Sequence, residues 1–223
     1  MTKLATIRDQ VLLNNGVSMP WLGFGVYLVQ PGQEVEQAVT AALATGYRSI
    51  DTAALYANEE GVGKAIRASG IPRSEIFVTT KLWNDRHGYE VALRTFEESR
   101  KRLRLEYVDL YLIHWPATTK VLETWRAFEK LLADGRVRAI GVSNFLVHHL
   151  DEIAKAKGKS VAQVLIRWDL QHEIISIPKS IHAERIKENA LVFDFELTSE
   201  EMSRIDGLKR GRRLGPDPDR FKS

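Results

Sequence analysis

Short apolar runs alternate with longer amphipathic stretches along most of the chain. In the first amphipathic stretch, the apolar residues follow the spacing of one helix face: Val35, Ala38, Val39, Ala42 and Leu43. Gly46 stands where such a helix is expected to end. Upstream, the pair Asn15-Gly16 is typical of the tight turn of a β-hairpin. The pattern therefore predicts a hairpin, and then a succession of strands and helices.

Six apolar runs have the length and composition of buried strands. They are Trp21–Leu28, Arg48–Asp51, Ile76–Lys81, Val108–His114, Val137–Ser143 and Ile174–Ile177. Segments long enough for a helix separate them. Strands that alternate with helices form a parallel sheet, so the sequence predicts an α/β fold built from βα units.

A polar residue closes most of these strands: Asp51, Lys81, His114, Ser143 and, after the last run, Lys179. Consecutive members lie about 30 residues apart, which is the length of one βα unit. In a (β/α) barrel the carboxyl ends of the strands carry the active site. A doubly wound open sheet also binds ligands at strand ends, but only near its switch point. Five contributing strand ends therefore favour a barrel.

The amino-acid composition limits the partners and the catalytic groups that the protein can have. With 44% hydrophobic and 27% charged residues, the 223-residue chain is typical of a globular protein. The net charge of +3 is too small to indicate a nucleic-acid partner. No apolar run approaches the ~20 residues of a membrane span, and the first residues do not resemble a signal peptide, so we expect a cytoplasmic protein. Zero cysteines exclude disulfides and thiolate catalysis. We expect no metal, because the adjacent pair His148-His149 cannot chelate from one helix face.

Asp51, Tyr56, Lys81 and His114 form a plausible acid-base set. An ammonium about 4 Å from a phenol contributes about 4 kcal/mol at an effective dielectric near 20. Lys81 is therefore expected to lower the pKa of Tyr56 from its usual ~10 towards neutrality. Asp51 would keep Lys81 charged, and His114 would orient a substrate oxygen. The set suits proton delivery to a carbonyl oxygen, and a bound nicotinamide would complete a reduction.

Taken singly, these residues have simpler interpretations. Asp51 could cap a helix, Lys81 could be a surface cation, and His114 could be a core histidine. The catalytic interpretation depends on the combination, because three successive strand ends carry an acid, a lysine and a histidine.

Six segments of the chain extend this combination: GYRSIDTAALYANEEGVG, FVTTKLWND, VDLYLIHWP, RAIGVSNF, IPKSIHAERIKEN and RRLGPDPDRF. Together they resemble the aldo-keto reductases, and most closely the bacterial branch of 2,5-diketo-gluconate and methylglyoxal reductases. The resemblance implies a (β/α)8 TIM barrel that reduces small aldehydes and ketones with NADPH. It also implies that Tyr56 is the general acid, that Lys81 and Asp51 tune it, and that His114 orients the carbonyl.

The same resemblance assigns cofactor contacts. Ser143 and Asn144 match the pair that holds the nicotinamide carboxamide. The 2′-phosphate of NADPH and its adenine are matched by five residues: Lys179, Ser180, Arg185, Glu188 and Asn189. Three aromatic residues are expected to wall the substrate pocket: Tyr27, Trp83 and Trp115. Trp125 and Trp168 follow helix periodicity and are expected to be packing residues.

One part of the family pattern has no counterpart. The chain, residues 1–223, is expected to be a single barrel domain, yet after Glu152 it continues directly into a segment resembling the helix after the seventh strand. Strands six and seven are therefore missing at a discontinuity near 152–153. We favour the explanation that residues are absent from the sequence as written, which would leave a monomeric barrel. The alternative is that the protein itself lacks them. A true deletion predicts weak NADPH affinity and exposed strand edges that favour self-association.

Two other functions fit parts of the pattern. A barrel of this kind could bind the cofactor and catalyse little. Alternatively, Lys81 could form a Schiff base in a lyase, although Asp51 argues against this because a neighbouring carboxylate keeps a lysine protonated. The segment GVGKAI (61–66) resembles part of a dinucleotide fingerprint but does not join a strand to a helix.

Overall fold

The computed structural model describes residues 5–13, 15–115, 120–143 and 159–197, together with Met202 and Ile205. Three features of the sequence lie outside these residues: Asn144, the pair His148-His149 and the expected discontinuity near 152–153.

A β-hairpin precedes the main sheet, as Asn15-Gly16 predicted. Strands β1 (Gln10–Leu12) and β2 (Ser18–Pro20) pair antiparallel. Gly16 turns the chain with a φ of 81°, a conformation that glycine adopts without strain.

The main sheet is parallel and follows the chain. Its strands, in spatial order, are β3 (Phe24–Gly25), β4 (Ser49–Asp51), β5 (Phe77–Leu82), β6 (Val108–Ile113) and β7 (Val137–Val142). On the free side of β3, isolated parallel bridges join Leu22 to Ser176 and Gly25 to Lys179. All six predicted strands thus have a counterpart. The first and the last are shorter than predicted, the last being limited to these two bridges.

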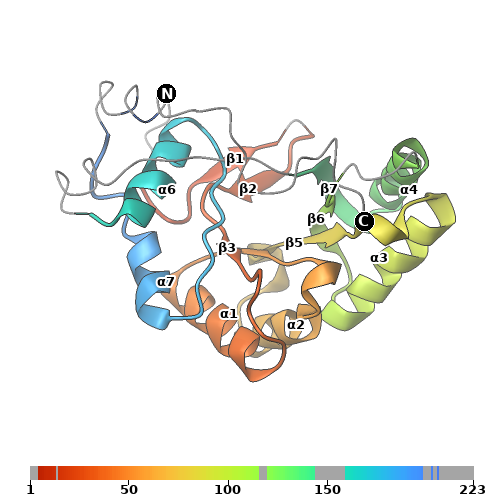
Figure 1. Ribbon diagram of the computed structural model, residues 1–223, viewed down its shortest axis with the longest axis horizontal. Helices are drawn as coiled ribbons and strands as arrows, with labels where there is room; N and C mark the ends of the chain where they lie inside the picture. Colours follow the sequence, from red (N-terminus) through yellow and green to blue (C-terminus); the bar gives the residue numbers. More distant parts are fainter. Residues whose placement is uncertain are drawn as a thin grey trace.

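Helices separate the strands and surround the sheet (Figure 1). They are α1 (Gln33–Thr45), α2 (Glu59–Ala68), α3 (Tyr89–Leu103), α4 (Val121–Ala133), α6 (Val161–Gln171) and α7 (Ala183–Ala190). Short 3-10 helices occupy Ala54–Tyr56, Arg73–Glu75 and Asn84–Arg86. Neighbouring helices pack in the order α6, α7, α1, α2, α3, α4. None of the described helices is long and apolar enough to cross a bilayer.

The core lies between the strands and these helices. The face of α1 predicted from the sequence is buried, and Gly46 ends the helix in the left-handed conformation with a φ of 113°. Both tryptophans expected to pack do so: Trp125 against the main core, and Trp168 against a smaller cluster that includes Val164.

The segment GVGKAI lies inside α2, which excludes a strand-to-helix phosphate loop. A Cβ at Gly63 would lie 2.0 Å from the backbone oxygen of Leu103, and one at Gly61 would lie 2.4 Å from Val35. These glycines therefore let α2 approach α3 and α1 closely.

The order of elements is that of a (β/α)8 barrel. A strand-like segment near the end of the chain returns to the first strand, and helices follow strands around the sheet. The described residues supply six of the eight strand positions, in the order 176–179, β3, β4, β5, β6, β7.

Candidate active site

The predicted site residues gather at the carboxyl ends of the parallel strands. Asp51 ends β4 and is in register with Gly25, which is also bridged to Lys179. Lys81 is the second-to-last residue of β5, and His114 follows β6 directly. The His114 backbone N–H donates to the Leu82 oxygen at 3.1 Å, so the peptide of His114 is fixed to the neighbouring strand.

A buried ion pair forms the centre of the site. Lys81 Nζ donates to Asp51 Oδ1 at 2.5 Å and to the backbone oxygen of Thr52 at 3.0 Å. It also lies 3.5 Å from the hydroxyl of Tyr56, which lies on the 3-10 helix after β4. These three acceptors match the three protons of an ammonium group. The structure thus brings together Asp51, Tyr56 and Lys81.

The pKa of Tyr56 is shifted upward, so the predicted downward shift is wrong. Burial of the phenol is the largest cause, followed by the charge of Asp51 and the neighbouring Tyr27. The physical reason is that Asp51 largely cancels the charge of Lys81, so the phenol faces a neutral pair rather than a free cation. Tyr56 therefore keeps its proton throughout the neutral range.

His114 is a neutral imidazole at physiological pH. Burial, with a contribution from the Lys81 ammonium, lowers the pKa of His114 to about 4. Its ring packs edge-on against Tyr56, with 5.8 Å between the centroids. A neutral imidazole has one N–H donor, so His114 can donate a hydrogen bond to an oxygen without competing with Tyr56 as an acid.

The three aromatic residues predicted for the pocket surround these groups. The ring of Tyr27 lies 5.0 Å from that of Tyr56, centroid to centroid. The ring centroids of Trp83 and Trp115 lie 5.1 and 6.5 Å from that of His114. Tyr27 is 52% exposed, so an aromatic surface borders the polar groups at the open side of the site.

Sequence reasoning missed Asn58. This residue is buried, accepts a hydrogen bond from the Thr52 hydroxyl at 2.8 Å and donates to the backbone oxygens of Val26 and Val29 at 2.9 and 3.0 Å. It thereby ties the loop that carries Tyr27 to the loop that carries Thr52 and Tyr56. A polar residue two positions after Tyr56 was a signal, but its distant carbonyl partners were not visible in the sequence.

The residues predicted to bind the 2′-phosphate lie before and within the first turn of α7. Lys179 and Arg185 are exposed, and within the described part of the chain neither forms an ion pair. Ser180 is buried, and its hydroxyl accepts from the His182 backbone N–H at 3.1 Å. Two cations without acidic partners beside a helix N-terminus fit a phosphate group.

The remaining predicted cofactor residues lie after β7 and at the end of α7. Ser143 follows β7 at the same edge of the sheet, whereas its predicted partner Asn144 lies outside the described residues. Glu188 and the buried Asn189 occupy the last turn of α7. Gln163 of α6 donates to the Glu188 backbone oxygen at 2.9 Å, which fixes this end of α7.

The fold and the site together define a class of protein: a (β/α) barrel enzyme whose strand ends carry a phenol, an ion pair and a neutral imidazole for reaction at a carbonyl oxygen. Comparison with known proteins agrees. The model of the aldo/keto reductase family matches residues 22–153 and 146–210. The chain belongs to the aldo/keto reductase family.

Two curated relatives are similar over nearly their whole length. Glyoxal reductase of Bacillus subtilis is 46% identical, covering 96% of this chain and 98% of the relative. Methylglyoxal reductase DkgA of Yersinia pestis is 39% identical, covering 98% and 99%. The alignment with glyoxal reductase extends over 269 positions, more than the 223 residues of this chain. The relative therefore has residues with no counterpart here.

Solved structures support the same fold class. MGS-M4, an aldo-keto reductase from a Medee basin deep-sea metagenome library, has a TM-score of 0.90 at 40% identity, covering 96% of this chain and all of the other. A variant of Gox0644 in complex with NADPH has a TM-score of 0.88 at 36% identity, covering 96% and 99%. As a family member with this fold, the chain is an oxidoreductase that reduces carbonyl groups with NADPH, as the resemblance implied.

Replacing Asn58 by alanine should loosen the catalytic loops. The variant leaves the oxygens of Val26 and Val29 without their donor, so we expect unfolding in urea to show a loss of about 2–4 kcal/mol. We also expect kcat to fall more than KM rises, because Tyr56 loses its fixed position.

Asn15→Ala is the matched control, since Asn15 is exposed; its side-chain amide donates to the Arg138 oxygen and accepts from the Val17 N–H. An Asn58→Ala variant with the stability and kcat of the wild type would show that these bonds do not position the site.

Proposed function

We propose that this protein reduces small aldehydes and ketones, such as glyoxal, methylglyoxal and keto sugars, with Tyr56 as the general acid. The observation that carries the proposal is the buried Lys81, which contacts both Asp51 and the Tyr56 hydroxyl. The glyoxal and methylglyoxal reductases among its relatives support the substrate class.

Tyr56 supplies the proton. When a carbonyl is reduced, its oxygen acquires negative charge and becomes a stronger base than a phenolate, even one whose pKa burial has raised. The proton therefore moves from Tyr56 to the substrate only as the reaction proceeds. The phenolate left behind lies 3.5 Å from the Lys81 ammonium, which stabilises it.

His114 orients the carbonyl. Because its pKa is lowered to about 4, the imidazole is neutral at pH 7 and can donate one hydrogen bond to the substrate oxygen. The aromatic rings of Tyr27, Trp83 and Trp115 border this position and exclude water around a small substrate.

NADPH, when bound, supplies the hydride. In our proposal Ser143 and Asn144 hold its carboxamide, Lys179, Ser180 and Arg185 its 2′-phosphate, and Glu188 and Asn189 its adenine. Lys179 and Arg185 are exposed cations that form no ion pair with the described residues, which supports the phosphate assignment. A cytoplasmic location stays a prediction.

The two rival functions are less well supported. A Schiff-base lyase needs a neutral lysine, whereas Lys81 donates to a carboxylate at 2.5 Å and is held as an ammonium. A cofactor-binding barrel with little activity would not require Asp51, Tyr56, Lys81 and His114 to be brought together, as they are.

We also propose that the chain lacks, at the discontinuity near 152–153, the segment that carries strands six and seven in its relatives. Two findings support this. The family model matches in two parts that overlap at residues 146–153, and relatives align over more positions than the chain has residues. In this barrel, β7 and the segment 176–179 would be separated by two strand positions that the described residues do not supply.

Substituting Tyr56 by phenylalanine should remove the acid and leave the pocket intact. We expect kcat for methylglyoxal to fall about 10²- to 10⁴-fold, the usual contribution of a general acid, with NADPH affinity unchanged. NADPH oxidation measures the first and fluorescence titration the second. Tyr107→Phe, whose ring packs under Arg73 outside the site, should behave as wild type. Retained turnover in the Tyr56 variant would refute the assignment.

Lys179→Met should reduce selectivity for the phosphorylated cofactor. Loss of one charge-assisted contact is expected to weaken NADPH binding about 10-fold while NADH binding changes little, because NADH lacks the 2′-phosphate. Lys187→Met is the control, since Lys187 is an exposed lysine on α7, the helix that follows Lys179 in the chain. Equal weakening for both cofactors would place Lys179 elsewhere in the cofactor site.

The proposed deletion predicts a weaker cofactor site overall. The missing segment carries, in the family, an aromatic shelf under the nicotinamide and a loop over the pyrophosphate. We expect the wild-type NADPH Kd to exceed that of Bacillus subtilis glyoxal reductase at least about 10-fold, and sedimentation to show self-association through unpaired strand edges. A monomer with the relative's affinity would contradict both expectations.

A further inference from the structure

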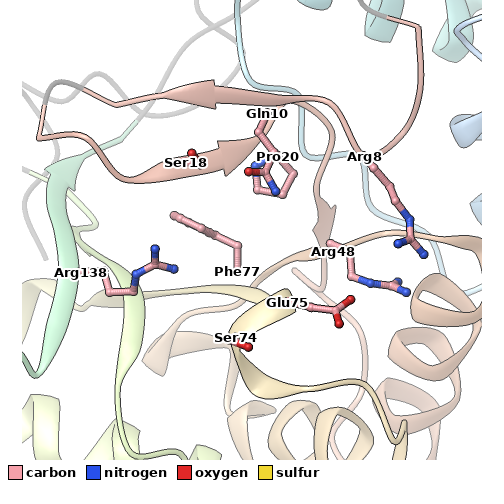
Figure 2. A pocket seen from close by; sticks show the side chains of 9 residues that line it. All are labelled: Arg8, Gln10, Ser18, Pro20, Arg48, Ser74, Glu75, Phe77 and Arg138. Carbon is pink, nitrogen blue, oxygen red and sulfur yellow. The ribbon is translucent and has the colours of Figure 1, made fainter.

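A second cavity lies at the end of the barrel opposite the active site. Its volume is about 250 Å³, and it lies between the hairpin and the amino ends of the strands. Arg48 precedes β4, whereas Asp51 ends that strand, so the cavity and the catalytic pair lie at opposite ends of β4. Figure 2 shows side chains from the hairpin, from the start of the main sheet and from β7 around this space.

Arginines dominate the lining of this cavity. Arg8, Arg48 and Arg138 come from three different parts of the chain, and Glu75 is the one carboxylate among the lining residues. In Figure 2 the guanidinium groups of Arg8 and Arg48 lie on the same side of the cavity, next to Glu75. Burial and the charge of Arg8 lower the pKa of Arg48, whereas the charge of Glu75 raises it, so Glu75 offsets part of the repulsion between the two arginines.

The carboxylates nearby leave positive charge uncompensated. Asp109 is fully buried and is shared by two arginines, Arg73 at 2.6 Å and Arg138 at 2.8 Å. Within the described part of the chain, neither Arg8 nor Arg48 forms an ion pair, including with Glu75. Among the residues named here, four arginines (Arg8, Arg48, Arg73 and Arg138) are therefore accompanied by two carboxylates, Asp109 and Glu75.

Two hydrogen bonds hold the Arg48 guanidinium in place, and some of its N–H donors have no partner among the described residues. Its Nη1 donates to the backbone oxygens of Leu43 and Tyr47 at 3.2 and 2.8 Å. Among the described residues, its Nε has no hydrogen-bond partner, and no bond involves Nη2. The guanidinium is therefore fixed before any ligand binds, which reduces the entropy that binding costs.

We propose that this cavity binds a small oxyanion of the phosphate class. Guanidinium groups match the geometry of phosphate oxygens, and a doubly charged anion relieves the repulsion between Arg8 and Arg48. Ser18, Ser74 and Gln10 line the same space and supply further donors. The volume admits a phosphate or the phosphate group of a small metabolite, but not a nucleotide.

Calorimetric titration of the wild-type protein tests the proposal. Inorganic phosphate and glycerol 3-phosphate are each added at constant ionic strength, with saturating NADPH present so that the cofactor's phosphate position is occupied. We expect each of these ligands to bind at one site, and we expect no comparable binding when chloride is added instead. Equal binding of the ester would identify a metabolite phosphate as the ligand, and preference for inorganic phosphate would identify the free ion; both results support an oxyanion site.

Arg8→Gln should weaken this binding at least tenfold, because Arg8 is exposed and its loss breaks no ion pair among the described residues. Arg94→Gln is the matched control, since Arg94 is also exposed and unpaired there, on α3 away from the cavity. Ser18→Asp provides a second variant, which adds a negative charge to the lining and leaves the bonds of Arg48 intact.

Absence of binding by the wild type, or equal affinity in Arg8→Gln and Arg94→Gln, would overturn the proposal. Loss of binding in Lys179→Met alone would also overturn it, by assigning the phosphate to the cofactor site. Because the readout is anion binding, failure here is independent of the proposed reductase activity.

Discussion

The buried pair of Lys81 and Asp51 is the interaction on which the site depends. Two opposite charges 2.5 Å apart, both shielded from solvent, stabilise each other only while both are present. Removing one leaves an uncompensated buried charge, which is strongly destabilising. The pair also fixes two strands relative to each other, because Asp51 ends β4 and Lys81 lies near the end of β5. The same interaction therefore holds the strand ends together and places an ammonium beside Tyr56.

The neutrality of this pair determines how the phenol behaves. An isolated ammonium would make Tyr56 more acidic in the resting protein, and a proton would then be lost before a substrate arrives. With Asp51 present and the ring partly buried, the pKa of Tyr56 is raised and the proton is retained. In the proposed reaction the ammonium acts when the phenolate forms, because a new negative charge then lies 3.5 Å away. In this arrangement the lysine stabilises the product of proton transfer more than it promotes ionisation at rest.

The strand ends could be predicted from the sequence because they follow one rule: an apolar run closed by a polar residue, repeated at the spacing of a βα unit. That rule placed Asp51, Lys81 and His114 at one end of the sheet, where the structure has them. It could not give the sign of the pKa shift of Tyr56, which depends on burial and on the distance from Asp51 to Lys81. Nor could it reveal Asn58, whose partners are backbone oxygens about thirty residues upstream.

The placement of the site around the barrel separates catalysis from cofactor affinity. Tyr27, Asp51, Lys81 and His114 belong to β3 to β6 and the loops that follow them, which are consecutive neighbours in the sheet. The proposed cofactor contacts instead lie on both sides of the two strand positions that the described residues do not supply: Ser143 follows β7, and Lys179 forms the bridge to Gly25. If strands six and seven are absent, the proton-delivering groups keep all their neighbours, whereas a dinucleotide loses the surface between its two halves. A deletion of this kind therefore weakens cofactor binding without removing the chemistry at the carbonyl oxygen.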